Sequence, residues 1–509
     1  MKNILYIVLL TGLITSCVKL DEDPRSQIST DNFYKTQSDA VAAVQSIYAD
    51  LTHNTSGDHA SIYNRLLVLA TGMMTDDNIP GPRATNPDVR SIAALTQTAT
   101  NTRYYELWRQ HYEAINRANI AIDRLPSITS GDTAVINRLV LEAKFLRGLL
   151  YYNLVRLWGD VPLLIHETKS LDNLNVSRTP ANAVYTQIVN DLTDATRLPK
   201  KYSGADAYRA TSGAARALLL SVSVTCQQWA DAIAQYKSIV SGGYGYDLLP
   251  NYADVFSSTK KFTAEHIFDA NFIADGSTTL NGTGNTNILS YISAPVNGFN
   301  AGDGVGGDAD APIVTLRGFF IAKDKRASVT FADSILTSVN GKLVKTYSPH
   351  FYKYWDASAA KNPINNGVNV PIIRYAEVVL FYAEAENELN GPTTEAYLAI
   401  NSVRHRAGLA DLTASLTKDQ FRDSIFFERK LEFVYEQIRW FDLIRTNGSG
   451  KPLLIQALKD LTNPVKGGNA TDTWTVAKAN NVSEKFYLLP IPASEIIANP
   501  NLTQNPGWN

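Results

Sequence analysis

Along most of the chain, hydrophobic side chains recur every three or four residues, which is the spacing of an amphipathic helix. In the segment 104–123, Trp108, Tyr112, Ile115 and Ile122 fall on one stripe. Such a stripe predicts a helix with one buried face. The same pattern predicts a helix that contains Leu141 and ends at Gly159. Later helices are expected from 180 towards 199, over 212–226, 229–240, 374–389 and 393–407, and from 417 towards 445.

Local signals support several of these boundaries. Thr179 is expected to cap a helix that has Pro180 as its first residue, because proline suits that position. Residues 417–420 match a capping box, and 390–392 form a turn between two helices. Helices of this length, joined by short turns and with alanines at 230, 232 and 234 for close contact, indicate tetratricopeptide-like pairs. Since the repeat spacing is irregular, we expect a mostly α fold built on a degenerate array.

The helical pattern stops in the middle of the chain. Residues 251–369 are rich in Gly, Asn, Ser and Thr and lack a sustained helical period. Irregular segments of this length inside a compact protein are uncommon and usually functional. We therefore expect one domain over 31–509, with an N-terminal part to about 250, an irregular variable insert and a C-terminal helical part from about 370.

The N-terminus has the features of a secretory signal. Lys2 precedes an apolar run over 4–14, which is too short to span a bilayer. Residues 13–17, ending in Cys17, resemble a bacterial lipobox, which implies cleavage after residue 16 and acylation of the Cys17 thiol. The acidic stretch within the expected tether, 17–30, is similar to those of surface lipoproteins in Bacteroidetes. The alternative is a plain signal peptide in which this cysteine occurs by chance.

Composition narrows the class of protein. The chain has 509 residues, with 47 basic and 49 acidic side chains and a formal net charge of -2. A nearly neutral chain has no electrostatic attraction for nucleic acid or an anionic membrane surface. The hydrophobic fraction of 45% excludes disorder, and the charged fraction of 19% excludes a polytopic membrane protein. Cys226 is the second of only two cysteines and is expected to be a core thiol.

The motifs of common enzymes are missing. The seven histidines show no zinc-binding spacing, and there is no nucleophile elbow or phosphate-binding loop. The glycines in 302–307 formally match a dinucleotide motif, but they lack its strand and helix. The aspartates Asp303, Asp308 and Asp310 would repel a phosphate. They leave two interpretations open for the loop 302–310, a calcium site or a solvated loop. No metal or cofactor is predicted.

Three carboxylates fall on one helical face, at Glu428, Glu432 and Glu436. A pair of them could serve as acid and base in a surface hydrolase. Like charges at this spacing repel unless cations intervene, and arginines are close in sequence. We therefore favour structural salt bridges. The expected partners are Arg404, Arg406, Arg429, Arg439 and Arg445.

Several sequence blocks in a fixed order resemble the SusD/RagB family. They extend from Trp108 to Trp508, behind the lipobox, and so cover nearly the whole chain. The blocks include Glu142-Ala143-Lys144-Phe145-Leu146-Arg147-Gly148, Leu157-Trp158-Gly159-Asp160-Val161-Pro162, Pro371-Ile372-Ile373-Arg374-Tyr375-Ala376-Glu377, Val403-Arg404, Arg406-Ala407-Gly408-Leu409, Arg439-Trp440-Phe441-Asp442-Leu443 and Asn505-Pro506-Gly507-Trp508.

This resemblance implies a lipid-anchored protein of the cell outer membrane that faces outwards and is not an enzyme. Such proteins form a lid on a SusC-like TonB-dependent transporter and capture nutrients, most often oligosaccharides. Their tetratricopeptide-like helices face the transporter, and irregular loops form the ligand site. In this reading Arg374, Tyr375 and Trp440 belong to the scaffold. The alternative is a helical adaptor that handles a non-glycan ligand such as a peptide and has no glycan affinity of its own.

Ligand-binding residues are then expected in the variable segments. The segment 79–103 contains no aromatic residue, which departs from the glycan-binding pattern in which rings stack on sugars. Polar residues near it and side chains of the insert are the remaining candidates. The predicted ligand-binding residues are Asp76, Asp77, Asn78, Arg83, Tyr291, Phe299 and Asp303.

Overall fold

The computed structural model describes residues 33–509 except 54–60, 171–173, 275–284, 446, 467 and 469. The expected signal peptide, Cys17 and the tether lie outside the described residues, so the expected division of the chain stays a prediction. In the described part, no helix has both the length and the apolar character needed to cross a membrane.

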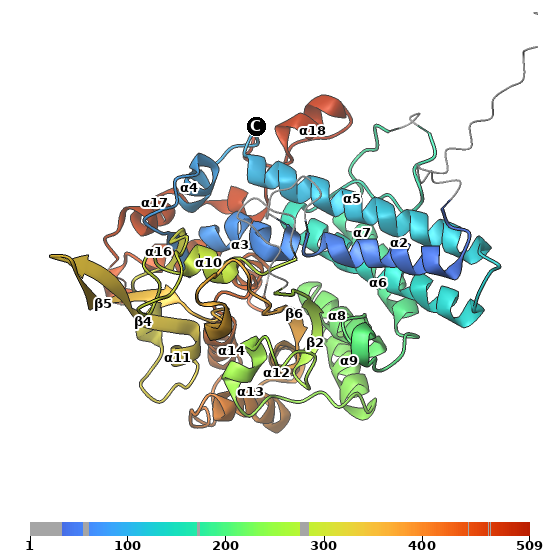
Figure 1. Ribbon diagram of the computed structural model, residues 1–509. Coiled ribbons are helices and arrows are strands. Elements are labelled where there is room, and N and C mark those ends of the chain that lie inside the picture. Colours follow the sequence, from blue (N-terminus) through green and yellow to red (C-terminus); the bar gives the residue numbers. More distant parts are fainter. Residues whose placement is uncertain are drawn as a thin grey trace, which may run out of the picture.

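Long helices dominate the N-terminal part, as the periodicity predicts (Figure 1). The helices up to residue 241 are α2 Gln37–Asp50, α3 Leu67–Ala70, α4 Pro87–Ala93, α5 Thr102–Arg124, α6 Thr133–Trp158, α7 Ala181–Ala195, α8 Ser212–Thr225 and α9 Trp229–Ser241. Neighbours in sequence pack on each other, α5 on α6, α6 on α7 and α8 on α9. This is the expected pairing of tetratricopeptide-like helices.

The C-terminal part returns to helices. They are α12 Tyr375–Asn390, α13 Thr394–Arg406, α14 Lys418–Glu432, α15 Arg439–Ile444, α16 Leu454–Asp460, α17 Thr473–Asn481 and α18 Ala493–Ala498. Helix α12 contacts α8 and α9 on one side and α13 and α14 on the other. It therefore joins the two helical parts, and its buried positions extend along nearly its whole length.

Two of the predicted capping signals are confirmed. Gly159 ends α6 with a φ of 71°, a left-handed conformation that glycine adopts without strain. Thr417 and Gln420 form both hydrogen bonds of a capping box at the start of α14. Helix boundaries follow from such local contacts, which is why sequence alone located them.

Two boundary predictions are wrong. Helix α7 has Pro180 as its N-cap, without a side-chain cap of its own, and the carboxylate of Asp160 accepts the Ala181 N–H at 2.8 Å instead. Helix α14 ends at Glu432 and does not continue towards 445, because Tyr435 and Gln437 adopt left-handed backbone conformations with φ of 65° and 64°. Helix α15 begins only after this turn, at Arg439.

The insert is largely irregular, but it contains strands that the pattern did not predict. It contains the short helices α10 Leu289–Ser293 and α11 Ala327–Thr330. Two of its strands pair with strands outside it, β3 Asp310–Pro312 with β1 Asn78–Pro80 and β2 His266–Ala270 with β6 Val370–Arg374, and within it β4 Phe331–Val339 pairs with β5 Lys342–Phe351. Each pair is a two-stranded antiparallel sheet. The last pair projects from one edge of the molecule (Figure 1). Its turn is Asn340-Gly341, both at positive φ, which is a strong local hairpin signal.

One large hydrophobic core runs through both helical parts and most of the insert. A second, small core lies within the insert and consists of Ala294, Phe299 and Trp355. Cys226 lies just after the end of α8, where it packs against the large core as expected of a core thiol, although it is partly exposed. Burial of the rest of its surface raises the pKa of the Cys226 thiol to about 11.

Candidate functional site

The segments that carry the seven predicted ligand residues meet in space. Strand β1 pairs with β3 of the insert, so that Ile79 lies opposite Ala311. The Arg83 N–H donates to the Asp308 carbonyl at 2.9 Å, and the Gly307 N–H donates to the Tyr291 carbonyl at 2.7 Å. The sequence-based choice of segments therefore selected one region of the molecule. The roles of the individual residues differ, as their burial shows.

Asp76 is held in a buried ion-pair triad. Its carboxylate accepts hydrogen bonds from Lys430 at 2.7 Å and from Arg439 at 2.8 Å, and only 3% of the residue is exposed. Burial alone would raise the pKa of Asp76, but the charges of Arg439 and Lys430 hold it well below its usual value. The carboxylate is thus ionised and fully engaged within the protein.

Asp77 and Asn78 lie deeper still. The Asn78 amide donates to the Asp310 carboxylate at 2.9 Å, and the Lys478 ammonium donates to the Thr75 carbonyl at 2.9 Å. Burial raises the pKa of Asp310 to about 7, and burial together with the charge of Asp76 raises that of Asp77 to about 6. Burial lowers the pKa of Lys478 to about 7. These groups form a titratable cluster inside the junction of β1, β3 and α17.

The insert residues divide in the same way. Phe299 is 5% exposed and packs edge-on against Tyr352 and Trp355, with ring centroids 5.0 and 4.9 Å away. The Asp303 carboxylate accepts the N–H groups of Phe299 and Asn300 and so shapes its own loop. Burial argues against ligand contact for Asp76, Asp77, Asn78 and Phe299. The ligand role stays a prediction for all seven residues, and Arg83, which is exposed, and the half-buried Tyr291 and Asp303 remain accessible.

The aspartates of the loop 302–310 do not converge on one point. The Asp303 carboxylate accepts from the backbone of its own loop, Asp308 lies 3.2 Å from His350, and Asp310 accepts from Asn78. Across the described residues, no group of three or more His, Cys, Asp or Glu side chains is placed to hold a metal ion.

A groove opens over the Asp76 triad. It has a volume of about 410 Å³, with Phe319 and Phe427 at its edge and Lys430 in its floor. The two phenylalanines are 39% and 43% exposed, and their ring centroids are 6.1 Å apart. The Lys430 ammonium lies 4.3 Å from the Phe319 ring centroid. Exposed rings above a charged floor can stack on an apolar ligand face and bind its polar edge.

Sequence reasoning missed Phe319 and Phe427. Phe427 belongs to α14, where its neighbours indicate an ordinary amphipathic helix, and Phe319 lies at the end of a short 3₁₀ helix, Leu316–Phe319. Only Asp76 among the seven predicted residues lines this groove. The available signal was the Phe426-Phe427 pair, because adjacent side chains on a helix point about 100° apart and cannot both lie at the centre of one buried face.

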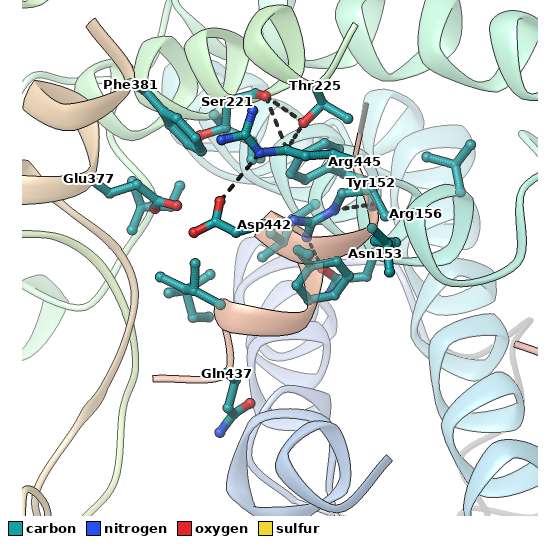
Figure 2. A pocket seen from close by; sticks show the side chains of 18 of the residues that line it. Tyr152, Asn153, Arg156, Ser221, Thr225, Glu377, Phe381, Gln437, Asp442 and Arg445 are labelled. Atoms are coloured by element: carbon teal, nitrogen blue, oxygen red, sulfur yellow. Dashed lines mark hydrogen bonds and ion pairs between the residues drawn. The ribbon is translucent and has the colours of Figure 1, made fainter. Parts of the chain in front are cut away.

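A second cavity of about 440 Å³ lies between α6, α8, α12 and α15 and shares no lining residue with the groove. Figure 2 shows Arg156, Tyr152 and Asn153 on one side of this cavity and Glu377 and Phe381 on the other. Cys226 also lines it. Both helical parts of the chain therefore contribute to the wall of this cavity.

Two family models match the chain. The one described as "SusD family" covers residues 268–508, and the one described as "Starch-binding associating with outer membrane" covers residues 20–223. The SusD-like protein P2 of Formosa agariphila is 29% identical over 99% of both chains, and a SusD-like protein of Bacteroides ovatus is 23% identical over 99% of this chain and 98% of its own. The chain belongs to the SusD/RagB family.

Solved structures of SusD proteins have the same fold. A SusD superfamily protein from Bacteroides vulgatus superposes with a TM-score of 0.76 at 24% identity, covering 94% of this chain and 100% of that one. A structure described as "Laminarin binding SusD-like protein" has a TM-score of 0.75 at 25% identity, covering 93% of this chain and 100% of its own. The expected SusD-like, mostly α fold class is confirmed.

In this SusD/RagB chain the family motifs form scaffold. The Glu432 carboxylate forms salt bridges with three arginines, Arg326 at 3.1 Å, Arg374 at 2.6 Å, and Arg406. Arg374 also binds Glu436 at 2.7 Å. The salt bridges expected for the three glutamates are thus confirmed. The complete network comprises Arg326, Lys353, Arg374, Arg404 and Arg406 with Glu265, Asp324, Glu428, Glu432 and Glu436.

Several of the partners differ from those expected. Arg404 and Arg406 bind the glutamates as predicted, whereas Arg429, Arg439 and Arg445 bind Asp442, Asp76 and Glu384. The remaining cations that bind the three glutamates are Arg326 and Lys353 of the insert and Arg374 of β6. Trp440 is 1% exposed, which confirms its packing role.

Proposed function

We propose that this protein captures oligosaccharides at the outer face of the cell outer membrane and delivers them to a SusC-like TonB-dependent transporter. The observation that carries the proposal is the groove edged by Phe319 and Phe427 in a chain of the SusD/RagB family. One matching family model is described as starch-binding, and one structural relative is described as binding laminarin; both support a glycan as the ligand.

The groove fits a sugar chain in size and chemistry. Its volume of about 410 Å³ is in the usual range for a small-molecule site. The rings of Phe319 and Phe427 supply faces for stacking, and Gln456 and Asp460 add polar groups to the wall. The Asp76 triad beneath them is fixed by its own ion pairs, so the floor is ordered before a ligand arrives.

Binding to a panel of polysaccharides that includes starch and laminarin tests this proposal. Removal of one ring costs about 1 kcal/mol, or about a fivefold weaker binding, so Phe319→Ala and Phe427→Ala should each weaken retention in an affinity gel. Tyr347→Ala is the matched control, because Tyr347 is 74% exposed but lies on the β4–β5 hairpin outside the groove. Unchanged affinity in both phenylalanine variants would refute this site.

Lipid attachment through Cys17 is part of the proposal. Its support is the lipobox resemblance and the family model's description of association with the outer membrane. Cys17→Ala should release the protein from the outer-membrane fraction. Continued attachment of that variant would contradict the lipobox interpretation.

Delivery to a transporter requires a stable complex. The tetratricopeptide-like helices of the N-terminal part are the surface that we propose faces the transporter. Purification of the native complex from outer membranes, followed by cross-linking and mass spectrometry, should place cross-links on α2 and α5–α9. A transporter complex together with no affinity for any polysaccharide would instead favour the adaptor for a non-glycan ligand such as a peptide.

We propose that the protein binds its glycan ligand without hydrolysing it. Glu428 and Glu432, the residues available to a hydrolase, both lie in the buried ion network with 0% of each residue exposed. An acid–base pair needs access to the scissile bond. Incubation of the protein with the glycan panel should therefore yield no product, and product formation that is lost in Glu428→Gln would support the hydrolase.

A further inference from the structure

The cavity between the two helical parts has the properties of a second binding site, separate from the groove. Its volume is about 440 Å³ and its wall includes the aromatic side chains of Tyr152, Tyr185, Phe441 and Tyr487. Tyr185, Tyr487 and Cys226 are partly exposed, so the cavity communicates with solvent. Cavities of this size and aromatic content are typical of small-molecule sites.

Arg156 is held rigidly in the wall of this cavity. Its guanidinium lies between the rings of Tyr152 and Phe441, at 3.7 and 3.8 Å from the two centroids. Its Nε donates to the Tyr152 carbonyl at 3.1 Å, and one terminal nitrogen, Nη2, donates to Asn153 Oδ1 at 2.8 Å. Both flat faces are covered, and the remaining donors project from the edge. Such preorganisation lowers the entropy cost of binding an anion, because this side chain is already ordered.

The other charged groups of the wall already have partners of opposite charge. Arg429 and Arg445 both bind Asp442, at 2.8 and 3.3 Å, and Glu436 binds Arg374 at 2.7 Å. Arg156 is different, because no carboxylate of the described chain lies within ion-pair distance of it, and its two acceptors are neutral oxygens. It is therefore a cation available to an external anion.

Other parts of the cavity wall offer acceptors. Gln437 donates to the Tyr63 carbonyl at 3.1 Å, while its Oε1 is buried without a hydrogen-bond partner among the described residues. Glu377 has one weak contact, with Arg429 at 3.4 Å, and Figure 2 shows it across the cavity from Arg156. The turn that presents Gln437 holds two non-glycine residues, Tyr435 and Gln437, at positive φ, a costly conformation that often marks a functional site.

We propose that this cavity binds a small organic carboxylate. The carboxylate pairs with the free edge of Arg156, and the body of the ligand lies against the partly exposed rings of Tyr185 and Tyr487. Hydroxyl or amino donors at its other end reach Gln437 and Glu377. An acidic monosaccharide and an amino acid or short peptide share this chemistry, and both fit a cavity of about 440 Å³.

Four probes distinguish the sources of such a carboxylate. D-glucuronate and D-glucose differ chiefly in the carboxylate, and L-leucine and L-leucinamide form the same contrast for amino acids. We expect at least one carboxylate to bind in titration calorimetry and its neutral or amidated counterpart to bind about tenfold more weakly or not at all. Glucuronate alone would assign an acidic sugar, and leucine alone would assign an amino acid or peptide. Absence of binding by both carboxylates would overturn the proposal.

Variants place the ligand in the cavity. Arg156→Gln should weaken carboxylate binding about tenfold or more, whereas Arg138→Gln on the same helix, which pairs with Glu142 outside the cavity, should leave it unchanged. Equal affinities of wild type and Arg156→Gln would overturn the assignment.

A measurement on the unmodified protein avoids any folding defect of the Arg156 variant. Cys226 lines the cavity and is partly exposed, so a bound ligand should slow its alkylation, measured peptide by peptide by mass spectrometry. An unchanged rate at saturating ligand would also overturn the proposal. Phe319→Ala and Phe427→Ala should weaken glycan binding in the groove but leave the protection of Cys226 by a bound carboxylate unchanged. This difference separates the present proposal from the one for glycan capture.

Discussion

Replacement of Glu432 by glutamine should strongly destabilise this protein, although the side chain keeps its size. The buried network contains five cations and five carboxylates, so its formal charge is balanced. Glu432 contacts three of the cations, Arg326, Arg374 and Arg406, and its own exposure is 0%. Glu432→Gln leaves one uncompensated positive charge in the interior and turns the amide –NH₂ towards guanidinium donors.

Loss of one partner from a buried ion pair typically costs about 3–5 kcal/mol. The expected loss is at the upper end of this range, because three cations share the one carboxylate. Burial would raise the pKa of Glu432, but the charges of Arg406, Arg374 and Arg326 hold it well below the usual value of 4.5. The carboxylate therefore contributes stability above about pH 4.5, and this contribution is lost as the pH falls below that value.

Urea unfolding followed by tryptophan fluorescence measures this effect at pH 7 and at pH 4. The matched control is Asp194→Asn, which breaks a partly exposed pair with Lys144 at 2.6 Å and a more exposed pair with Arg197 at 2.7 Å. This variant should change the unfolding free energy by about 1 kcal/mol or less. The difference in unfolding free energy between wild type and Glu432→Gln should be smaller at pH 4 than at pH 7. The carboxylate of the wild type loses part of its stabilising effect at the lower pH, whereas glutamine does not titrate. A loss of under about 1 kcal/mol at pH 7, equal to that of the control, would refute the structural role of the network.

Two further predictions concern groups whose pKa is raised by burial. Asp310→Asn should raise the melting temperature at pH 8 and leave it nearly unchanged at pH 4. The pKa of Asp310 is raised to about 7 from 3.8, so the native protein loses up to about 4 kcal/mol as the pH rises between those values. A lower melting temperature for the variant at pH 8 would contradict this reasoning. Cys226, with its pKa raised to about 11 by burial, should react with iodoacetamide slowly at pH 7 and at a rate that still rises above about pH 10, whereas a rate that levels off at about pH 10 would show an ordinary thiol.

Local sequence signals account for much of the helical scaffold. The stripe from Trp108 to Ile122 appears as α5, and the Thr417 capping box starts α14. The hairpin of β4 and β5 was missed although its Asn340-Gly341 turn is an equally local signal, because the composition of the insert dominated the interpretation. The end of α14 was misplaced because nothing in the local pattern reveals that Tyr435 takes a left-handed conformation.

The sequence by itself determined the family, the mostly helical fold and the presence of an irregular insert, since motifs and periodicity are properties of neighbouring residues. It also indicated that the face of Glu428, Glu432 and Glu436 needs cations. Only the tertiary structure decided which cations these are, and it placed Arg326 and Lys353 of the insert among them. Contacts between residues far apart in the chain leave no periodic trace, because each depends on how separate elements pack.

The dependence on packing also explains why the predicted ligand residues differ from the residues that line the groove and the second cavity. The sequence located the polar segment around Asp76, but only the packed structure shows that this carboxylate forms ion pairs with Lys430 and Arg439. The groove requires Phe319 and Phe427 to meet at its edge, and the second cavity requires α6 to face α15. Burial and juxtaposition are set by the whole fold, so the sequence could indicate where to look for a site and the three-dimensional structure alone could show which side chains are available.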